Sequence, residues 1–455
     1  AMTLRTALIT GCLSLSTLLT GPIGLAETIL REQQVRPLPG SLDSVLMVND
    51  NNPELIQNDG ILLSTFPSQS DGSISAQLTG RFDLFSHHVY AGDEEGSLKS
   101  TLWLALLVAP VGDNPVALTL LNGSTSLSQA TEDGQTQSPF LPLPTLMAET
   151  TDVVASGPGS RVAGDLLAGR TAQEFGQTQW QLKPGQPTAV MVLPVPVAGL
   201  DPLLNGRNLQ LRLLSTGPVS VAMLAAHGSG TTPPSLKRWR QVLNDGVLST
   251  KEHSPTPRGS KGKMIYSRVS GVQIGSTWAA KLTDSGRDVL LAPSEPLSWP
   301  ISSLERGTLG TNQIQTAELT AAYPGTAWAA HGNYGVEYDL TLPLKNAGST
   351  ATTLELSLDS PLKSDESQGG LQFRDSLSGP VMFRGPISIR GLDDNQGLPQ
   401  GRRTTHLVLR QGQRGPALGQ LTLEPGEERS VRVRLVYPAD ATPPQVLTVQ
   451  PVKQS

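Results

Sequence analysis

The chain has 455 residues, of which 16% are charged and 4% aromatic, and its formal net charge is −5. Such a weakly acidic chain is poorly suited to a phosphate backbone, which excludes nucleic-acid binding as its main function. The 46 glycines and 36 prolines separate short runs rich in Val, Leu and Thr, a pattern that predicts an all-β protein of many short strands.

The N-terminus has the order of residues found in a secretory signal peptide. Arg5 precedes an apolar stretch over residues 7–19, which is followed by Gly-Leu-Ala at 24–26. Cleavage after Ala26 would remove Cys12, the one cysteine of the sequence, and leave an exported protein without disulfides. Two alternatives stay open: lipoprotein processing at Cys12, and a buried strand or helix in this stretch. Elsewhere no stretch reaches the roughly 18 apolar residues of a membrane span.

Changes in composition divide the chain further. Residues 27–44 are polar and contain prolines, and residues 228–234 (GSGTTPP) form the clearest linker. We therefore expect a signal peptide at 1–26, an extended leader at 27–44, an N-terminal β-sandwich module at 45–232, a connector with a short helix and strands at 233–324, and a C-terminal immunoglobulin-like β-sandwich at 325–455. The predicted fold is two or more antiparallel β-sandwich modules, immunoglobulin-like or jelly-roll-like, with a short helical connector.

Within the first module, two apolar runs flank a turn sequence. Residues 102–111 and 116–121 are separated by Gly-Asp-Asn-Pro, which predicts a hairpin. Residues 122–152 are rich in Ser, Thr, Gln and Pro and are expected to form a long surface loop. Residues 157–160 (GPGS) predict a tight turn.

The connector contains the best helix candidate. Leu236, Trp239, Val242 and Leu243 are spaced along one helical face, and the pattern stops at Asp245-Gly246. A basic loop at 251–263 (KEHSPTPRGSKGK), which we expect to be mobile, follows this helix.

The sequence Leu-x-Pro-Gly precedes a strand twice, at 182–185 and at 423–426. Proline followed by glycine fits the centre of a type II turn, which leads into an edge or near-edge strand. After the second turn, alternation places Val431, Val433 and Leu435 inward and Arg432 and Arg434 outward. A solvated strand face is favoured here over a binding surface. The repeated order of hairpin and turn suggests two modules of similar plan.

Motifs for common chemistries are absent from the sequence. There is no Gly-x-Ser-x-Gly elbow, no phosphate-binding Walker loop and no dinucleotide fingerprint. His87 and His88 are adjacent on a predicted strand and would point to opposite faces, so they cannot easily share a metal. We expect no cofactor and no metal site. Asp83, Glu337 and Asp339 are formal candidates for a pair of hydrolytic carboxylates, although exposed strand residues are the simpler interpretation.

One cluster of side chains could contact a ligand. Residues 330–335 (AHGNYG) place His331, Asn333 and Tyr334 between glycines. An imidazole, an amide and an aromatic ring could bind and stack on a sugar. The alternative is a glycine turn in which Tyr334 packs over a domain junction.

Six stretches together resemble the cyanobacterial domain of unknown function (DUF) 3370 family. They are NDGILLST at 58–65, GRFDLFSHHV at 80–89, GPGSRVAGDLLAGR at 157–170, ERGTLGTNQIQ at 305–315, AHGNYGVEYDLTLPLKN at 330–346 and YPADATPPQVLTV at 437–449. The resemblance covers nearly the whole mature chain. It implies an exported envelope protein of a cyanobacterium, and it assigns neither an activity nor catalytic residues.

We therefore expect a non-enzymatic exported cell-envelope protein, periplasmic, outer-membrane-associated or extracellular. Its role would be structural or adhesive, through contact with envelope polysaccharide, peptidoglycan or another envelope protein. Two other classes stay open: an envelope glycan hydrolase that uses strand-borne carboxylates, and an inhibitor or assembly factor that binds through a strand edge.

Overall fold

The computed structural model describes residues 26–68, 71–92, 100–129, 142–229 and 231–453. Residues 1–25 of the predicted signal peptide, with Cys12, lie outside these ranges, as does part of the predicted loop at 122–152. The described chain consists mostly of β-strands in several sheets, as the sequence predicts, with two short helices.

Most strands belong to three sheets. The ten-stranded sheet contains β4 (Leu46–Leu55), β5 (Gly60–Ser64), β6 (Leu78–Ala91), β7 (Ser100–Pro110), β8 (Val116–Leu127), β10 (Gln179–Leu182), β11 (Thr188–Pro196), β12 (Leu204–Ser229), β13 (Val269–Ile274) and β17 (Leu319–Ala322). The eight-stranded sheet contains β3 (Ser41–Leu42), β9 (Leu146–Ala148), β14 (Thr277–Lys281), β15 (Leu290–Leu291), β18 (Glu337–Lys345), β21 (Val381–Arg390), β22 (Arg403–Arg410) and β24 (Glu428–Val436). The five-stranded sheet contains β2 (Gln34–Val35), β16 (Leu297–Ile301), β19 (Thr352–Asp359), β23 (Gly419–Leu423) and β25 (Gln445–Pro451).

A separate pair is formed by β1 (Thr28–Glu32) and β20 (Gly370–Arg374), and the helices are α2 (Pro158–Leu167) and α3 (Leu236–Asp245). Each helix has ten residues. Within the described ranges, no helix combines the length and apolar character needed to cross a lipid bilayer.

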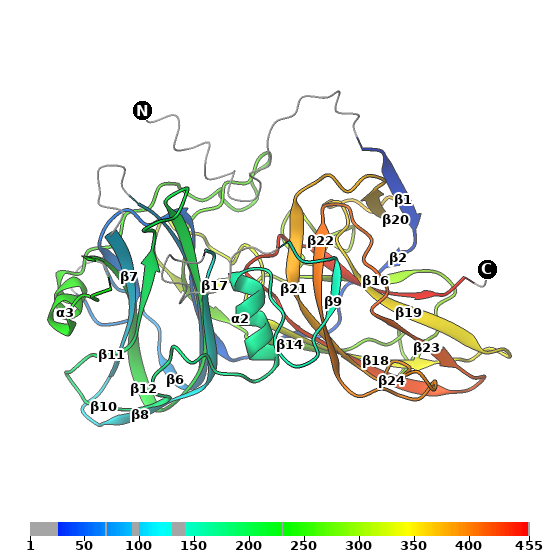
Figure 1. The fold of residues 1–455 in the computed structure, drawn as a ribbon, viewed down its shortest axis with the longest axis horizontal. Helices are drawn as coiled ribbons and strands as arrows, with labels where there is room; N and C mark the ends of the chain where they lie inside the picture. The colour runs from blue at the N-terminus through cyan, green and yellow to red at the C-terminus, as the bar shows by residue number, and fades with distance from the viewer. Residues whose placement is uncertain (1–25, 69–70, 93–99, 130–141, 230, 454–455) are drawn as a thin grey trace.

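Figure 1 shows two lobes side by side, with α2 between them. The first lobe is built around β12, a strand of 26 residues. Its first half pairs with β6 and β8, and its second half pairs with β7 and β5. Leu84, Leu106 and Leu211, from β6, β7 and β12, belong to one buried cluster, so both arms of the sheet close over a common core.

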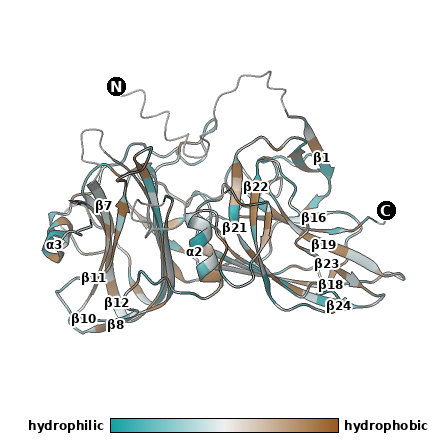
Figure 2. Cartoon of the chain, in the orientation of Figure 1, coloured by the Kyte–Doolittle hydropathy of each residue, from teal (hydrophilic) through white to brown (hydrophobic). Residues whose placement is uncertain are grey.

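The predicted helix in the connector is confirmed as α3, which covers the outer face of the first lobe. Trp239 and Val242 are buried against Ile61 of β5 and its neighbours. The Ser235 hydroxyl accepts a hydrogen bond from the backbone N–H of Arg238 at 3.2 Å and so caps the helix. Gly246, which has φ 65°, caps the C-terminal end of the helix. Figure 2 shows hydrophilic and hydrophobic residues on α3.

In the second lobe, the eight-stranded and five-stranded sheets share one hydrophobic core. Tyr338 and Val433 from the first sheet lie in the same buried cluster as Trp299 and Leu447 from the second. The predicted alternation along β24 is confirmed, because Val431, Val433 and Leu435 are buried whereas Arg432 is exposed. However, β24 pairs with β18 on one side and β21 on the other, so the expectation of an edge or near-edge strand is wrong.

Both Pro-Gly turns have the backbone expected of type II turns. Gly185 has φ 70° and Gly426 has φ 80°, values that a residue with a side chain rarely adopts. The first turn leads from β10, which pairs with β8, into β11, which pairs with β7. The second leads from β23 in the five-stranded sheet into β24 in the eight-stranded sheet. Each turn therefore connects strands that have no partner in common.

The predicted hairpin at 102–121 is wrong, although both of its strands exist. β7 and β8 pair with different halves of β12 instead of with each other. β12 is long enough to pair with both strands, with β8 along its first half and with β7 along its second half. Local turn chemistry cannot reveal such a distant competitor.

The tight turn predicted at residues 157–160 is the start of α2. Pro158 occupies the first turn, where its missing N–H removes no helical hydrogen bond. Asp440 of the second lobe accepts a hydrogen bond from the backbone N–H of Ser160 at 2.9 Å. A Cβ on Gly159 would lie 2.6 Å from the backbone nitrogen of Asp440, so glycine permits this close approach. Burial of its side chain raises the pKa of Asp440 to about 6.

Strand pairing crosses the predicted domain boundaries. The predicted leader supplies β1, β2 and β3, which pair with β20, β16 and β14 of the second lobe. The predicted connector supplies β13 and β17 to the first lobe and β14, β15 and β16 to the second. β9, which follows β8 in sequence, pairs with β22 of the second lobe. The two lobes are therefore built from interleaved parts of the chain.

Candidate functional site

A surface groove lies where the basic loop of 251–263 and the residues after it meet two other segments of the chain. Its cavity has a volume of about 40 Å³. The walls come from residues 255–256, 264–266, 304–305 and 327–331, together with Ile314 and Thr316. A space of this size accommodates roughly one water molecule or a methyl-sized group. The groove can therefore hold a small substituent while a larger ligand lies across its rim.

The rim of the groove is unusually apolar for a surface. Ile265 is 48% exposed, Tyr266 is 39% exposed and Ile314 is 53% exposed. Single exposed apolar residues are ordinary, but a cluster beside a cavity is typical of a binding surface.

His331 provides a polar group in the groove. Its Nε2 lies 2.8 Å from the carbonyl oxygen of Ser267, which can only accept, so Nε2 carries the proton. Burial lowers the pKa of His331, which keeps the ring neutral at pH 7 and leaves Nδ1 as an acceptor. The Tyr266 ring meets the imidazole edge-on, with 4.6 Å between the ring centroids.

Two arginines border the groove. The Arg258 guanidinium lies 4.1 Å from the centroid of the Trp328 ring and forms an ion pair with Glu318. Arg306 donates hydrogen bonds to the carbonyl oxygens of Ser260 and Gly262. The basic loop, which the sequence predicts to be mobile, is thereby attached to the segment that contains Arg306.

The structure separates the three predicted ligand contacts. His331 lines the groove, whereas Asn333 is fully buried and makes hydrogen bonds to Gln315 and Tyr338. Tyr334 lies at the boundary between the lobes. Its ring is 6.3 Å from that of Phe85 in β6 and 5.7 Å from that of Tyr437, and its hydroxyl donates to the carbonyl oxygen of Ala441.

The three carboxylate candidates all have arginine partners. Glu337 accepts hydrogen bonds from Arg212 of the first lobe and Arg434 of the second, at 2.8 Å each. Asp339 binds the Arg432 guanidinium through both oxygens, at 2.8 and 2.6 Å. Arg432 and Arg434 of β24 thus form ion pairs with carboxylates on β18.

Asp83 on β6 is the third candidate and forms an ion pair with Arg81. Burial raises its pKa, and the neighbouring Arg81 opposes that rise. Among the described residues, no three His, Cys, Asp or Glu side chains lie close enough together to hold a metal ion.

Sequence reasoning missed Tyr266, Trp328 and Arg306. The available signal was the change from a basic run to Met-Ile-Tyr at 264–266, which places apolar residues directly after cations. The contacts of Arg306 with the loop join residues more than 40 positions apart and leave no local pattern.

Comparison with known sequences identifies the family. No curated protein matches the chain. The model of the family described as "Protein of unknown function (DUF3370)" matches residues 33–451, which include both lobes and the whole groove. This confirms the resemblance seen in the six sequence stretches, and the chain belongs to the DUF3370 family of proteins of unknown function.

Proposed function

We propose that this protein is an exported, non-enzymatic cell-envelope protein that binds polysaccharide through the groove. The observation that carries the proposal is the exposed ring of Tyr266 next to the neutral His331 and the small cavity. Sugar rings present C–H groups that pack on aromatic faces, and their hydroxyls donate to acceptors such as an imidazole nitrogen. The cavity would receive a small substituent of the sugar.

The competing functions have less support. A hydrolase acting through Asp83, Glu337 or Asp339 would need a carboxyl group free to transfer a proton or attack, and each of these three pairs with arginine. A strand-edge binder would need a long open edge, whereas the edge strands β9 and β23 have three and five residues, and the nine-residue edge strand β11 contains Pro194 and Pro196, which disfavour pairing with an added strand. The two facing sheets of the second lobe support the predicted sandwich architecture.

The proposal of export rests on the signal-like residues 1–26. We expect residues 1–40, fused to a reporter that is active only outside the cytoplasm, to yield an active reporter. The same fusion without residues 1–26 is the control and should be inactive. An inactive full fusion, with the reporter found intact in the cytoplasm, would refute export.

Replacing Tyr266 by alanine should weaken binding to envelope polysaccharide by about tenfold or more, because stacking on an aromatic ring contributes a substantial part of such affinity. Tyr266→Phe should retain most of the binding, since the ring remains. The measurement is retention of residues 27–455 on isolated peptidoglycan, envelope polysaccharide and envelope proteins.

Leu121→Ala is the matched control, because Leu121 is 48% exposed on β8 of the first lobe, outside the groove. Equal retention of the wild type and Tyr266→Ala on the glycan fractions would remove the groove from the proposal. Retention by the protein fraction alone would make the chain an assembly component and reject polysaccharide binding.

A further inference from the structure

We infer that the ligand of the groove is an anionic polysaccharide, with carboxylate or sulfate groups on its sugars; this inference rests on the function proposed above. The first reason is local charge. Residues 251–263 contain four lysines or arginines and one glutamate, in a chain whose net charge is −5. The groove is therefore bordered by a positive segment on an acidic protein.

The second reason is that the structure gathers these cations. Arg306 binds the carbonyl oxygens of Ser260 and Gly262, the two residues that flank Lys261, and Lys263 follows directly. Lys261 and Lys263 are exposed, and neither forms an ion pair with any residue in the described ranges. Both ammonium groups are thus available to an anion.

The third reason is that Arg306 lies beside the aromatic ring, because it directly follows Glu305, which lines the groove together with Tyr266. Burial raises the pKa of Tyr266, and the nearby positive charge of Arg306 opposes the rise. Burial also lowers the pKa of Lys363; the negative charge of Asp365 opposes this shift, and the positive charge of Arg306 adds to it. Arg306 is therefore within electrostatic reach of both Tyr266 and Lys363.

Acidic neighbours offset part of this charge, but within the described ranges none of them forms an ion pair with Lys261 or Lys263. Glu318 is paired with Arg258, and Asp365 accepts a hydrogen bond from the backbone N–H of Thr308 at 3.1 Å. Glu305 is the acidic residue of the groove wall. A sugar ring stacked on Tyr266 would hold its anionic group near Arg306 and the two lysines, where charge-assisted hydrogen bonds strengthen binding.

The test compares polymers that differ in charge alone. Residues 27–455 are titrated with alginate, with carboxyl-reduced alginate, with dextran sulfate and with dextran. We expect at least about tenfold tighter binding to one or both anionic polymers than to the neutral partner, and a loss of this preference as salt concentration rises. Preference for alginate or for dextran sulfate identifies the anion as carboxylate or sulfate.

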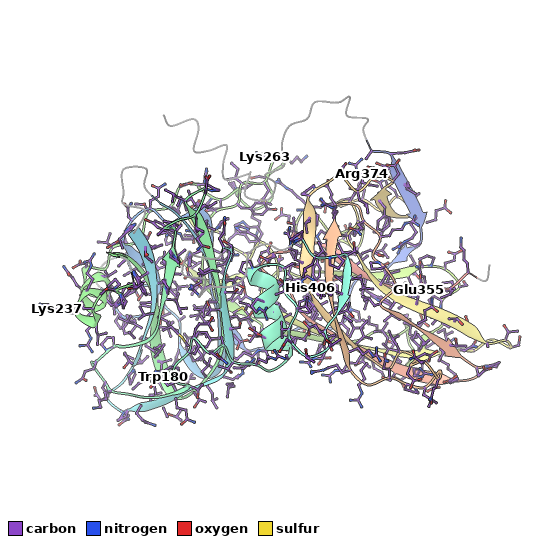
Figure 3. The ribbon with its side chains drawn as sticks, in the orientation of Figure 1. Trp180, Lys237, Lys263, Glu355, Arg374 and His406 are labelled. Atoms are coloured by element: carbon purple, nitrogen blue, oxygen red, sulfur yellow. The ribbon has the colours of Figure 1, made fainter. Side chains whose placement is uncertain are left out.

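Reversing the charge of Lys263 tests whether the preference for anionic polymers arises beside the groove. Lys263→Glu should weaken binding to the anionic polymer by about tenfold and leave binding to the neutral polymer unchanged. Lys237→Glu is the matched control, because Lys237 is an exposed lysine on α3 at the far end of the first lobe, well away from Lys263 (Figure 3).

Each of the other possible outcomes rejects either the anionic ligand alone or the proposed polysaccharide binding as well. Equal binding to charged and neutral polymers, reduced in Tyr266→Ala, would reject the anionic ligand and keep polysaccharide binding. Equal weakening by both charge reversals would show general attraction instead of a site beside the groove, and would also reject the inference. Failure to bind these polymers and every envelope polysaccharide would reject the proposed function itself. Binding to anionic lipid vesicles, without binding to polymers, would assign the same cations to a membrane surface and reject both.

Discussion

Replacing Arg31 by methionine is expected to lower the free energy of unfolding by about 3–5 kcal/mol, since it leaves a buried charge without its partner. The Arg31 guanidinium lies 2.6 Å from a carboxylate oxygen of Asp359, and the two side chains are 8% and 0% exposed. Arg31 also donates to Gln33 and Thr448, so it attaches β1 to the five-stranded sheet. Denaturation in urea measures the loss as a shift in midpoint at constant slope.

Arg36→Met is the control for this prediction. Arg36 pairs with Asp284 at 2.8 Å, but the two side chains are 28% and 19% exposed. Water screens such a pair, so its loss should cost less than about 1 kcal/mol. If Arg31→Met costs no more than Arg36→Met, the buried pair does not stabilise the N-terminal strand as argued.

Residues 325–455 expressed alone are expected not to fold. This fragment lacks the β14–β16 segment, which places Trp278, Leu290 and Trp299 in the core of the second lobe. Loss of one large buried side chain costs about 3–5 kcal/mol, and the total stability of a domain is about 5–15 kcal/mol. Near-ultraviolet circular dichroism and thermal unfolding would detect the absence of fixed packing.

The chain of residues 27–455 serves as the positive control, because it retains every strand of both lobes. A sharp, cooperative unfolding transition for the 325–455 fragment would contradict the prediction. That result would mean that the interleaved strands contribute little to the second lobe.

Local patterns predicted the local features of the fold. The spacing of Trp239 and Val242 predicted α3, and alternation predicted the buried face of β24, because each signal lies within one element. α2 was missed although Val162, Ala163, Leu166 and Leu167 have helical spacing, since Gly157 and Gly159 on either side of Pro158 indicated a tight turn. Pairing between distant strands, such as β14 with β18, leaves no trace in either segment.

The same contrast between local and long-range signals applies to the residues of the candidate site. His331 was identified from its own neighbourhood, and it does line the groove. Asn333 was chosen on the same grounds, but its amide is bonded to Gln315 and Tyr338, which a single segment cannot reveal. Tyr266 becomes a candidate only when the structure brings it to His331.

The interleaved strands also decide when the protein can fold. β25, the last strand of the chain, lies between β16 and β19 inside the five-stranded sheet, and β1 pairs with β20. The second lobe therefore cannot be completed until the end of the chain is present, and the first lobe needs the chain as far as β17, which follows β16 of the second lobe. Contacts of such high sequence separation make folding slow. Under the export proposed above, this delay has a use: the second lobe stays incomplete until the last strand has been made, so that part of the chain can pass through a membrane pore before its sheets form.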